Sequence, residues 1–280
     1  MNIVIEERWF EAHNRHLNFY RRAIPDNIRG GVLLSHGYSE HSKRYEHVMR
    51  AMAQQGLAVF AEDHRGHGRT ADVLGDLTSV DDVVEDLHIL RRELQSVIGT
   101  RPLFFFGHSM GALLTLRYLQ THGGGAGAIL NGPAIQIPQN IPRAAKVAAR
   151  VLADYAPLFA IQGFFNPERA CRDPEVWRQM RADPLRYKGK IRARTGREIM
   201  DAIAVTLPRL SEIELPVLVT HGTDDETVRA EMATVLFDAV SSTDKAIHLF
   251  DGLRHEVQHE PERDDVIEVW TDWLADHLVG

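Results

Sequence analysis

A serine between two glycines is the first feature of this sequence that could carry out chemistry. Residues 107–111 (GHSMG) follow an apolar aromatic run at 103–106 and precede a stretch of helical period at 112–120. A serine on so tight a strand-to-helix turn is strained, with its hydroxyl above the sheet, and only glycine fits two positions to either side. The next amide, that of Met110, begins the helix and can donate to an oxyanion. The pattern predicts Ser109 as the nucleophile of an acyl-transfer reaction.

A nucleophilic serine needs two partners, a histidine that accepts its proton and a carboxylate that fixes the tautomer of that histidine. When the serine occupies such a turn, the acid follows a late strand and the histidine follows the last strand. The apolar run at 216–220 leads into Asp224 and Asp225, and the run at 246–250 leads into His255. His255 is therefore the predicted base, and the acid is one of the two neighbouring aspartates.

Short apolar runs recur along the chain and alternate with stretches of helical period. Six such runs lie at residues 31–35, 58–61, 102–106, 127–130, 216–220 and 246–250. Continuous apolar runs are typical of strands that are covered on both faces of a parallel sheet. The clearest helix, at 80–98, has apolar residues at i, i+3, i+4 and i+7, with Thr78 or Ser79 as its N-cap and Gly99 just past its end. The alternation predicts a doubly wound, mostly parallel α/β sheet.

The segment 133–208 interrupts this alternation, because it carries no strand run. It contains an amphipathic stretch at 141–155 and an arginine-rich stretch at 178–197 with DPE and DPL turns nearby. Both of its ends return to strands, so we expect a helical cap over the strand ends, where loops of α/β sheets carry function. The predicted division is a core of residues 1–132 and 209–280 with a cap of residues 133–208. The alternative is an ordinary crossover with extra helices.

Seven short motifs, spread between about residues 30 and 262, have the order and composition of a known family. They are residues 35–45 (SHGYSEHSKRY), 63–69 (DHRGHGR), 107–111 (GHSMG), 173–175 (DPE), 183–185 (DPL), 221–225 (HGTDD) and 252–256 (GLRHE). The first resembles the HGxxEHSxRY signature, and the second the DxRGHGxS loop, of the monoacylglycerol lipase and lysophospholipase branch of the α/β-hydrolase superfamily, the serine aminopeptidase S33-like hydrolases. The resemblance implies the α/β-hydrolase fold with a helical cap, and hydrolysis of fatty acyl esters without a cofactor.

The resemblance also implies roles for individual residues. Asp225 has the family's spacing, three residues after Gly222, whereas Asp224 is the neighbouring competitor. The family position of Tyr38 implies that its backbone N–H is the second oxyanion donor, beside that of Met110.

Glu40 and Arg44 match positions near the polar head-group pocket of monoacylglycerol lipases. An internal ion pair between them that only holds the loop is an equally good interpretation.

The predicted function is a monoacylglycerol lipase or lysophospholipase that cleaves a small lipid-like ester through an acyl-enzyme at Ser109. A general carboxylesterase, thioesterase, amidase or iminopeptidase would use the same triad, because fold and triad do not fix the substrate. A non-catalytic ligand-binding relative would be expected to lose a triad residue, and all three are present here. Dehalogenases and epoxide hydrolases need an aspartate in place of Ser109.

Charge and hydropathy exclude several other classes of protein. The formal net charge of the 280 residues is -7, with both signs mixed along the chain, so nucleic acid is not an expected partner. The start of the chain lacks the apolar core of a signal peptide, and no run of about 18 apolar residues exists. We therefore expect a cytoplasmic protein with at most transient membrane-surface contact through the apolar face of residues 141–155. The sequence predicts no oligomeric state.

Fifteen histidines and one cysteine suggest metal or thiol chemistry. His64 and His67 are three residues apart, but the glycines around them indicate a loop, and no third ligand has a fitting spacing. Cys171 has no activating neighbour in the sequence and cannot form an intramolecular disulfide. His248 lies within a strand run, and His259 lies too far past the last loop to compete with His255. We predict no metal and no cofactor.

Overall fold

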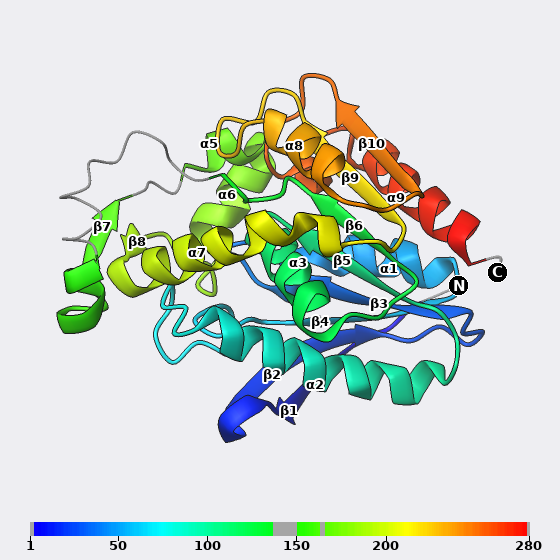
Figure 1. The fold of residues 1–280 in the computed structure, drawn as a ribbon, viewed down its shortest axis with the longest axis horizontal. Coiled ribbons are helices and arrows are strands. Elements are labelled where there is room, and N and C mark those ends of the chain that lie inside the picture. Colours follow the sequence, from blue (N-terminus) through cyan, green and yellow to red (C-terminus); the bar gives the residue numbers. More distant parts are fainter. Residues whose placement is uncertain (1–2, 137–149, 163–165, 279–280) are drawn as a thin grey trace.

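Eight strands form one sheet in the order β1-β2-β4-β3-β5-β6-β9-β10 in the computed structural model, which describes residues 3–136, 150–162 and 166–278 (Figure 1). The strands are β1 (Ile5–Glu11), β2 (Leu17–Ala23), β3 (Gly30–Ser35), β4 (Leu57–Glu62), β5 (Leu103–His108), β6 (Gly127–Asn131), β9 (Val217–Gly222) and β10 (Lys245–Phe250). In this order, the neighbours within β4-β3-β5-β6-β9-β10 pair in parallel, whereas β2 pairs antiparallel with both β1 and β4. The predicted mostly parallel α/β sheet is confirmed.

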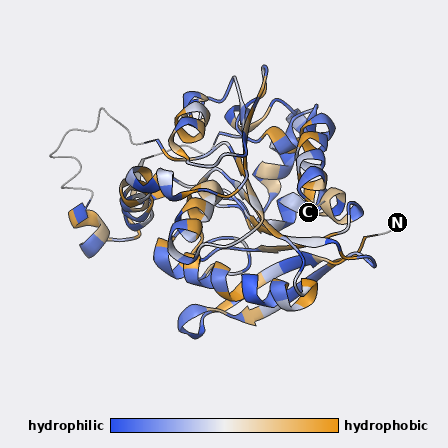
Figure 2. Ribbon diagram, turned by 45° about the vertical axis from the view of Figure 1, so that its right-hand side comes forward, coloured by the Kyte–Doolittle hydropathy of each residue, from blue (hydrophilic) through white to orange (hydrophobic). Residues whose placement is uncertain are grey.

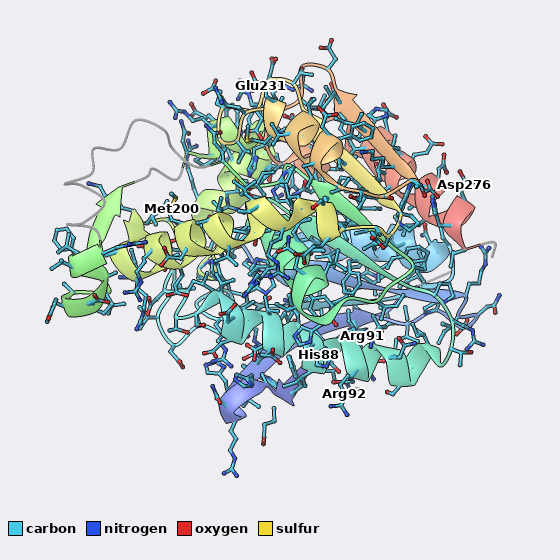
Figure 3. All side chains as sticks on the ribbon, viewed as in Figure 1. His88, Arg91, Arg92, Met200, Glu231 and Asp276 are labelled. Atoms are coloured by element: carbon cyan, nitrogen blue, oxygen red, sulfur yellow. The ribbon has the colours of Figure 1, made fainter. Side chains whose placement is uncertain are left out.

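Helices cover both faces of the sheet. They are α1 (Glu46–Gln54), α2 (Val80–Ile98), α3 (Met110–His122), α8 (Glu231–Ala239) and α9 (Arg263–His277). One face packs against α2, α3 and α8, and the opposite face packs against α1 and α9. Each covering helix carries both hydrophobic and hydrophilic residues (Figure 2). Exposed charged residues such as Arg92, Glu231 and Asp276 lie on the solvent side of α2, α8 and α9 (Figure 3).

The central strand β5 shows how the sequence builds this double core. Successive side chains of a strand point to opposite faces. Phe105 therefore packs on the side of α2 and α3, while Phe104 and Phe106 pack on the side of α1 and α9. The ring of Phe106 meets Trp270 of α9 edge-on, with 4.8 Å between the ring centroids. Because both faces are buried, the strand appears in the sequence as a continuous apolar run.

Helix α2 has the predicted bounds. The Ser79 side chain accepts a hydrogen bond from the Asp82 amide at 3.1 Å, so Ser79 is the N-cap rather than Thr78. Gly99 follows the last turn with φ at 66°, a conformation that favours glycine.

The segment between β6 and β9 adds no strand to the large sheet in its described part. It contains β7 (Ala160–Gln162), α5 (Pro167–Ala170), α6 (Pro174–Ala182), β8 (Ile191–Arg192) and α7 (Ala193–Thr206). The short antiparallel pair β7–β8 corrects the expectation of a purely helical segment, and it lies at the left of Figure 1. Of the amphipathic stretch predicted at 141–155, residues 141–149 lie outside the described residues. The division into core and cap stays a prediction.

Within the described ranges, no helix combines the length and the apolar character that crossing a membrane would require.

Candidate active site

Ser109 occupies the turn between β5 and α3, with φ at 55° and ψ at -116°. Such a positive φ is rare for a residue other than glycine and marks local strain. The flanking glycines are required by space. A Cβ on Gly111 would lie 2.1 Å from the Ser35 carbonyl oxygen, and one on Gly107 would lie 2.5 Å from the Gly111 carbonyl oxygen. The turn therefore forms as the sequence pattern predicts.

Ser109, His255 and Asp225 lie in one chain of hydrogen bonds. His255 Nδ1 is 2.6 Å from Asp225 Oδ2, and His255 Nε2 is 2.8 Å from Ser109 Oγ. Because a carboxylate only accepts, the Nδ1–H of His255 donates to Asp225. The Nε2 of the neutral ring is then an acceptor for the Ser109 hydroxyl, which is the arrangement a proton transfer from serine requires.

Asp225 is buried, and its side chain is saturated with hydrogen bonds. Its Oδ1 accepts from the amides of Thr227 and Val228 at 2.7 and 2.9 Å, and its Oδ2 lies 2.9 Å from His221 Nε2. Burial raises the pKa of Asp225, but the charge of His255 and the hydrogen bonds from both rings and from the Val228 amide outweigh it, so the pKa lies below its usual value. The carboxylate is thus ionised and fixed in orientation.

The competing aspartate, Asp224, is exposed to solvent. The structure thus brings Asp225, and not Asp224, to His255. Burial lowers the pKa of His255, whereas the charge and hydrogen bond of Asp225 raise it, and the net direction is upward. The ring is therefore a stronger base than a free imidazole.

Tyr38 and the first turn of α3 border the space above Ser109. A Cβ on Gly37 would lie 3.3 Å from the Ser109 Cβ, so the loop that carries Tyr38 presses closely on the serine. The Tyr38 hydroxyl donates to the Gly75 carbonyl at 3.1 Å, and Tyr38 borders the same pocket as Ser109. Oxyanion binding by the amides of Tyr38 and Met110 stays a prediction.

Glu40 and Arg44 form an ion pair, with 3.3 Å between Arg44 Nε and Glu40 Oε2. Glu40 Oε1 accepts from the Gly37 amide at 2.7 Å and from the Tyr45 hydroxyl at 2.6 Å, so it holds the loop beside Ser109. Glu40 also borders the pocket. These contacts fit the loop-holding interpretation, and a contact with substrate stays a prediction.

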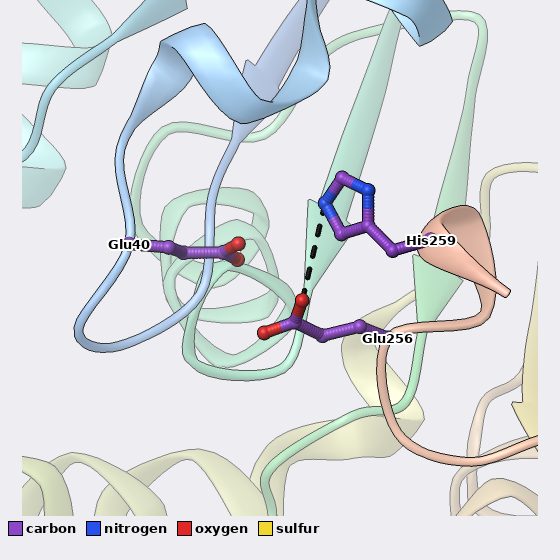
Figure 4. A group of neighbouring side chains, drawn as sticks. All are labelled: Glu40, Glu256 and His259. Atoms are coloured by element: carbon purple, nitrogen blue, oxygen red, sulfur yellow. Dashed lines mark ion pairs between the residues drawn. The ribbon is translucent and has the colours of Figure 1, made fainter. Parts of the chain in front are cut away.

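Glu40, Glu256 and His259 bring three possible metal-ligand atoms within 4.8 Å of one another (Figure 4). Glu256 already pairs with Arg44 at 2.5 Å and with Arg186 at 3.0 Å. Two guanidinium groups thus balance the two carboxylates, and a divalent cation would add buried charge that nothing compensates. The chemistry of this cluster is that of a buried ion-pair network.

His64 and His67 are buried among other rings. The His64 amide donates to His36 Nε2 at 3.0 Å, and the His36 and His64 rings lie 4.2 Å apart. Burial lowers the pKa of His64 to about 3 and that of His67 to about 4, so both rings are neutral. Their role here is to shape the loops behind the site.

Ser109 and His255 open into a pocket of about 320 Å³. The segment after β6 contributes Asn166, Arg169, Arg186, Gly189 and Ile191 to its wall, and the loop after Asp225 contributes Glu226 and Thr227. A larger surface groove of about 1300 Å³ is lined by residues of α1, α6 and α9 and includes no triad residue.

Three polar residues of the site have no signal in the sequence motifs that predicts their contacts. They are His221, which binds Asp225, Glu256, which follows His255, and Arg186, which pairs with Glu256. Arg186 and Glu256 are 70 positions apart, and no spacing rule relates them. Their burial can be seen only in the folded structure.

Comparison with known proteins shows the family of the chain. The sequence model of the family described as "Serine aminopeptidase, S33" matches residues 26–262. The monoacylglycerol lipase of Mycolicibacterium smegmatis is 34% identical over 252 residues, which cover 89% of each protein. The caffeoylshikimate esterase of Arabidopsis thaliana is 29% identical over 289 residues, which cover 96% of this chain and 85% of that protein.

A solved structure gives the same answer for the fold. The crystal structure of Paleococcus ferrophilus monoacylglycerol lipase superimposes with a TM-score of 0.82 at 26% identity and covers 99% of this chain and 100% of its own. The chain therefore belongs to the serine aminopeptidase, S33 family, and it is a serine hydrolase with the α/β-hydrolase fold.

Proposed function

We propose that this protein is a carboxylic ester hydrolase that cleaves monoacylglycerols through an acyl-enzyme on Ser109. The observation that carries the proposal is the unbroken hydrogen-bond chain from Asp225 through His255 to Ser109 Oγ. The relatives from Mycolicibacterium smegmatis and Paleococcus ferrophilus, both named monoacylglycerol lipase, supply the substrate class.

The reaction proceeds in two halves. Ser109 Oγ attacks the ester carbonyl carbon while His255 Nε2 takes the hydroxyl proton, and Asp225 stabilises the imidazolium. The amides of Tyr38 and Met110 donate to the oxyanion. His255 then protonates the departing glycerol oxygen and leaves an acyl-enzyme. Water, activated by the same ring, releases the fatty acid, so every proton is accounted for by Ser109, His255 and water.

Two features of the described residues support a lipid ester with a polar head group. Glu40, Arg169 and Glu226 are charged groups on the pocket wall, and Arg169 pairs with Glu226 at 3.2 Å. Hydroxyl groups of glycerol can hydrogen-bond to such side chains.

The second feature is a group of large apolar side chains, exposed on the described part of the cap. They are Val151, Tyr155, Leu158 and Phe159, with Tyr155 87% exposed. Exposed apolar groups that lie together mark surfaces for contact with lipid or protein. They support transient contact of the cap with a lipid surface that presents the substrate.

The test is kcat/KM for acetyl, butyryl, octanoyl and palmitoyl monoacylglycerols, with lysophosphatidylcholine, a caffeoyl ester and a peptide amide alongside. Each buried methylene contributes up to about 0.8 kcal/mol, so kcat/KM should rise with chain length until the pocket is full. Ser109→Ala should lower kcat by about 10⁴-fold or more, whereas the exposed control Ser96→Ala should not change it. A maximum at acetyl, or a better rate on the amide or the caffeoyl ester, would contradict the substrate proposal.

A further inference from the structure

Residues 183–187, called the strap below, join α6 to the turn before β8 and include the DPL motif that the proposed mechanism does not use. Asp183 ends α6, and its Oδ1 accepts a hydrogen bond from the Leu185 amide at 2.9 Å. This bond between an aspartate and the backbone two residues on fixes the turn. The strap thus has a defined path as it leaves the helix.

The strap holds the loop that carries Tyr38. His41 Nε2 lies 2.7 Å from Asp183 Oδ2, and the Tyr187 amide donates to the Ser39 carbonyl at 3.1 Å. Burial raises the pKa of Asp183, but the hydrogen bond and charge of His41 bring it down to about 2, so the carboxylate is ionised. Ser39 has φ at 69°, a conformation that is strained for any residue other than glycine and that neighbouring contacts must maintain.

Aromatic packing continues the same contact. The rings of Tyr38 and Tyr187 meet edge-on at 6.1 Å between centroids. A Cβ on Gly75 would lie 2.4 Å from the Tyr187 ring, and the Gly75 carbonyl accepts from the Tyr38 hydroxyl. The backbone of Tyr38 is therefore fixed from behind by groups of the strap and by Gly75.

The strap also holds the loop that carries His255. Buried Arg186 donates from Nη2 to Glu256 Oε1 at 3.0 Å, and Glu256 directly follows His255. The other carboxylate oxygen of Glu256 accepts from Arg44, which also pairs with Glu40. One chain of charged contacts thus links the strap, the histidine loop and the loop beside Ser109.

We infer that Asp183 and Arg186 are positioning residues, through which the strap sets the geometry of the Tyr38 amide and of His255 together. The inference rests on the proposed function, because it assumes that these two groups act in one reaction. It assigns to the cap a contribution to the rate of the chemical step, in addition to binding the substrate. Displacement of a catalytic group by about 1 Å can cost about 100-fold in rate.

The charged surroundings of His255 give Arg186 a separate signature. Burial lowers the pKa of His255, but the negative charges of Asp225, Glu256 and Glu40 raise it. The ring centroid of His108 lies 4.8 Å from that of His255. Arg44 and Arg186 neutralise Glu256. Removal of Arg186 leaves more negative charge beside His255, so the ring should protonate at higher pH. The acid limb of the kcat/KM profile should then move upward.

The experiment measures kcat, KM and pH profiles with p-nitrophenyl butyrate for Asp183→Ala, Asp183→Asn, Arg186→Met and Arg186→Lys. We expect kcat to fall about 10- to 100-fold in Asp183→Ala and Arg186→Met, with KM within about threefold of wild type. Asp183→Asn should recover part of the loss, since its single amide oxygen can still accept the hydrogen bond from the Leu185 amide. The matched control is Arg181→Met, a cap arginine that pairs with Glu168 at the surface and should stay within twofold.

Only Arg186→Met should shift the acid limb, and Arg186→Lys should return it because the charge is restored. Should Arg186→Met fail to fold, the inference is judged on Arg186→Lys and the Asp183 pair. Folded variants that keep the wild-type kcat, including variants in which only KM rises, overturn the inference. A wild-type protein that neither hydrolyses this ester nor reacts with a fluorophosphonate would instead refute the proposed function itself.

Discussion

At the scale of residues, the structure distinguishes the two neighbouring aspartates that the motif alone allows as the acid of the triad. Asp225 is buried and binds the His255 and His221 rings and two amides, whereas Asp224 is exposed. The difference arises from the turn after β9, which leaves Asp224 exposed and buries Asp225, the residue that follows it. Only the inward side chain can fix the tautomer of His255 and stabilise its charged form.

Replacement of each aspartate by asparagine tests this assignment. Asp225→Asn should lower kcat by roughly 10³- to 10⁴-fold, because an amide neither stabilises the imidazolium nor fixes the right tautomer. Asp224→Asn should change kcat by less than about threefold, as expected for an exposed side chain that makes no contact with the ring. The measurement is steady-state hydrolysis of p-nitrophenyl butyrate, with circular dichroism to verify folding. Equal losses in the two variants would mean that the acid has been misassigned.

At the scale of elements, parallel strands explain how residues far apart in the chain come together. Ser109, Asp225 and His255 follow β5, β9 and β10 respectively. Because these strands run in parallel, their carboxyl ends lie at the same edge of the sheet, where α/β folds place their sites. The strand order β5-β6-β9-β10 brings the three ends close to one another.

The turn after β5 should tolerate no side chain at Gly111. A Cβ there would approach the carbonyl oxygens of Ser35 and His36 to 2.1 and 2.7 Å, and backbone atoms cannot move aside as a side chain can. We expect Gly111→Ala to reduce the free energy of unfolding by about 3 kcal/mol or more. The matched control is buried Gly31, for which the atoms nearest to an added Cβ are side-chain atoms of Ile98 and Leu94 at 3.1 Å.

Urea unfolding followed by tryptophan fluorescence measures both variants. Gly31→Ala should cost clearly less than Gly111→Ala, since side chains can shift by a few tenths of an ångström. A Gly111→Ala protein as stable as the wild type would show that the turn has more room than this geometry allows.

At the scale of the whole molecule, the parts that were predicted are those with a local signature. The six predicted strands are present. Strands β3, β4, β5, β6 and β9 are buried on both faces and therefore give continuous apolar runs, whereas β10 is an edge strand whose apolar run is partly exposed. β1 and β2 were not predicted. β1 is an edge strand with one buried residue, Phe10, so its sequence is largely polar and contains no continuous apolar run. The contact of Arg186 with Glu256 was not predictable, since it joins distant segments through a charge pair that no period or motif encodes.

Another property of the whole molecule is the number of histidines buried in neutral form. Burial lowers the pKa of His36, His64, His67, His108 and His259. In the unfolded chain these rings titrate near pH 6.5. The unfolded state therefore binds more protons below that pH, and the folded state loses stability as the pH falls. Buried Glu62, whose pKa is raised, acts in the opposite direction.

We expect a net uptake of about three protons on unfolding between pH 6 and 5, so the free energy of unfolding should fall by about 4 kcal/mol over that unit. Carboxylates with lowered pKa, such as Asp183, lose their contribution only at lower pH, as the pH falls from the unfolded pKa of about 4 to the folded pKa of about 2. The measurement is urea unfolding at constant ionic strength across pH 5 to 8. His67→Asn, which keeps a donor for the Arg65 carbonyl, should reduce the slope by about one proton. A flat profile from pH 6 to 5 would show that the buried rings already carry protons in the folded protein.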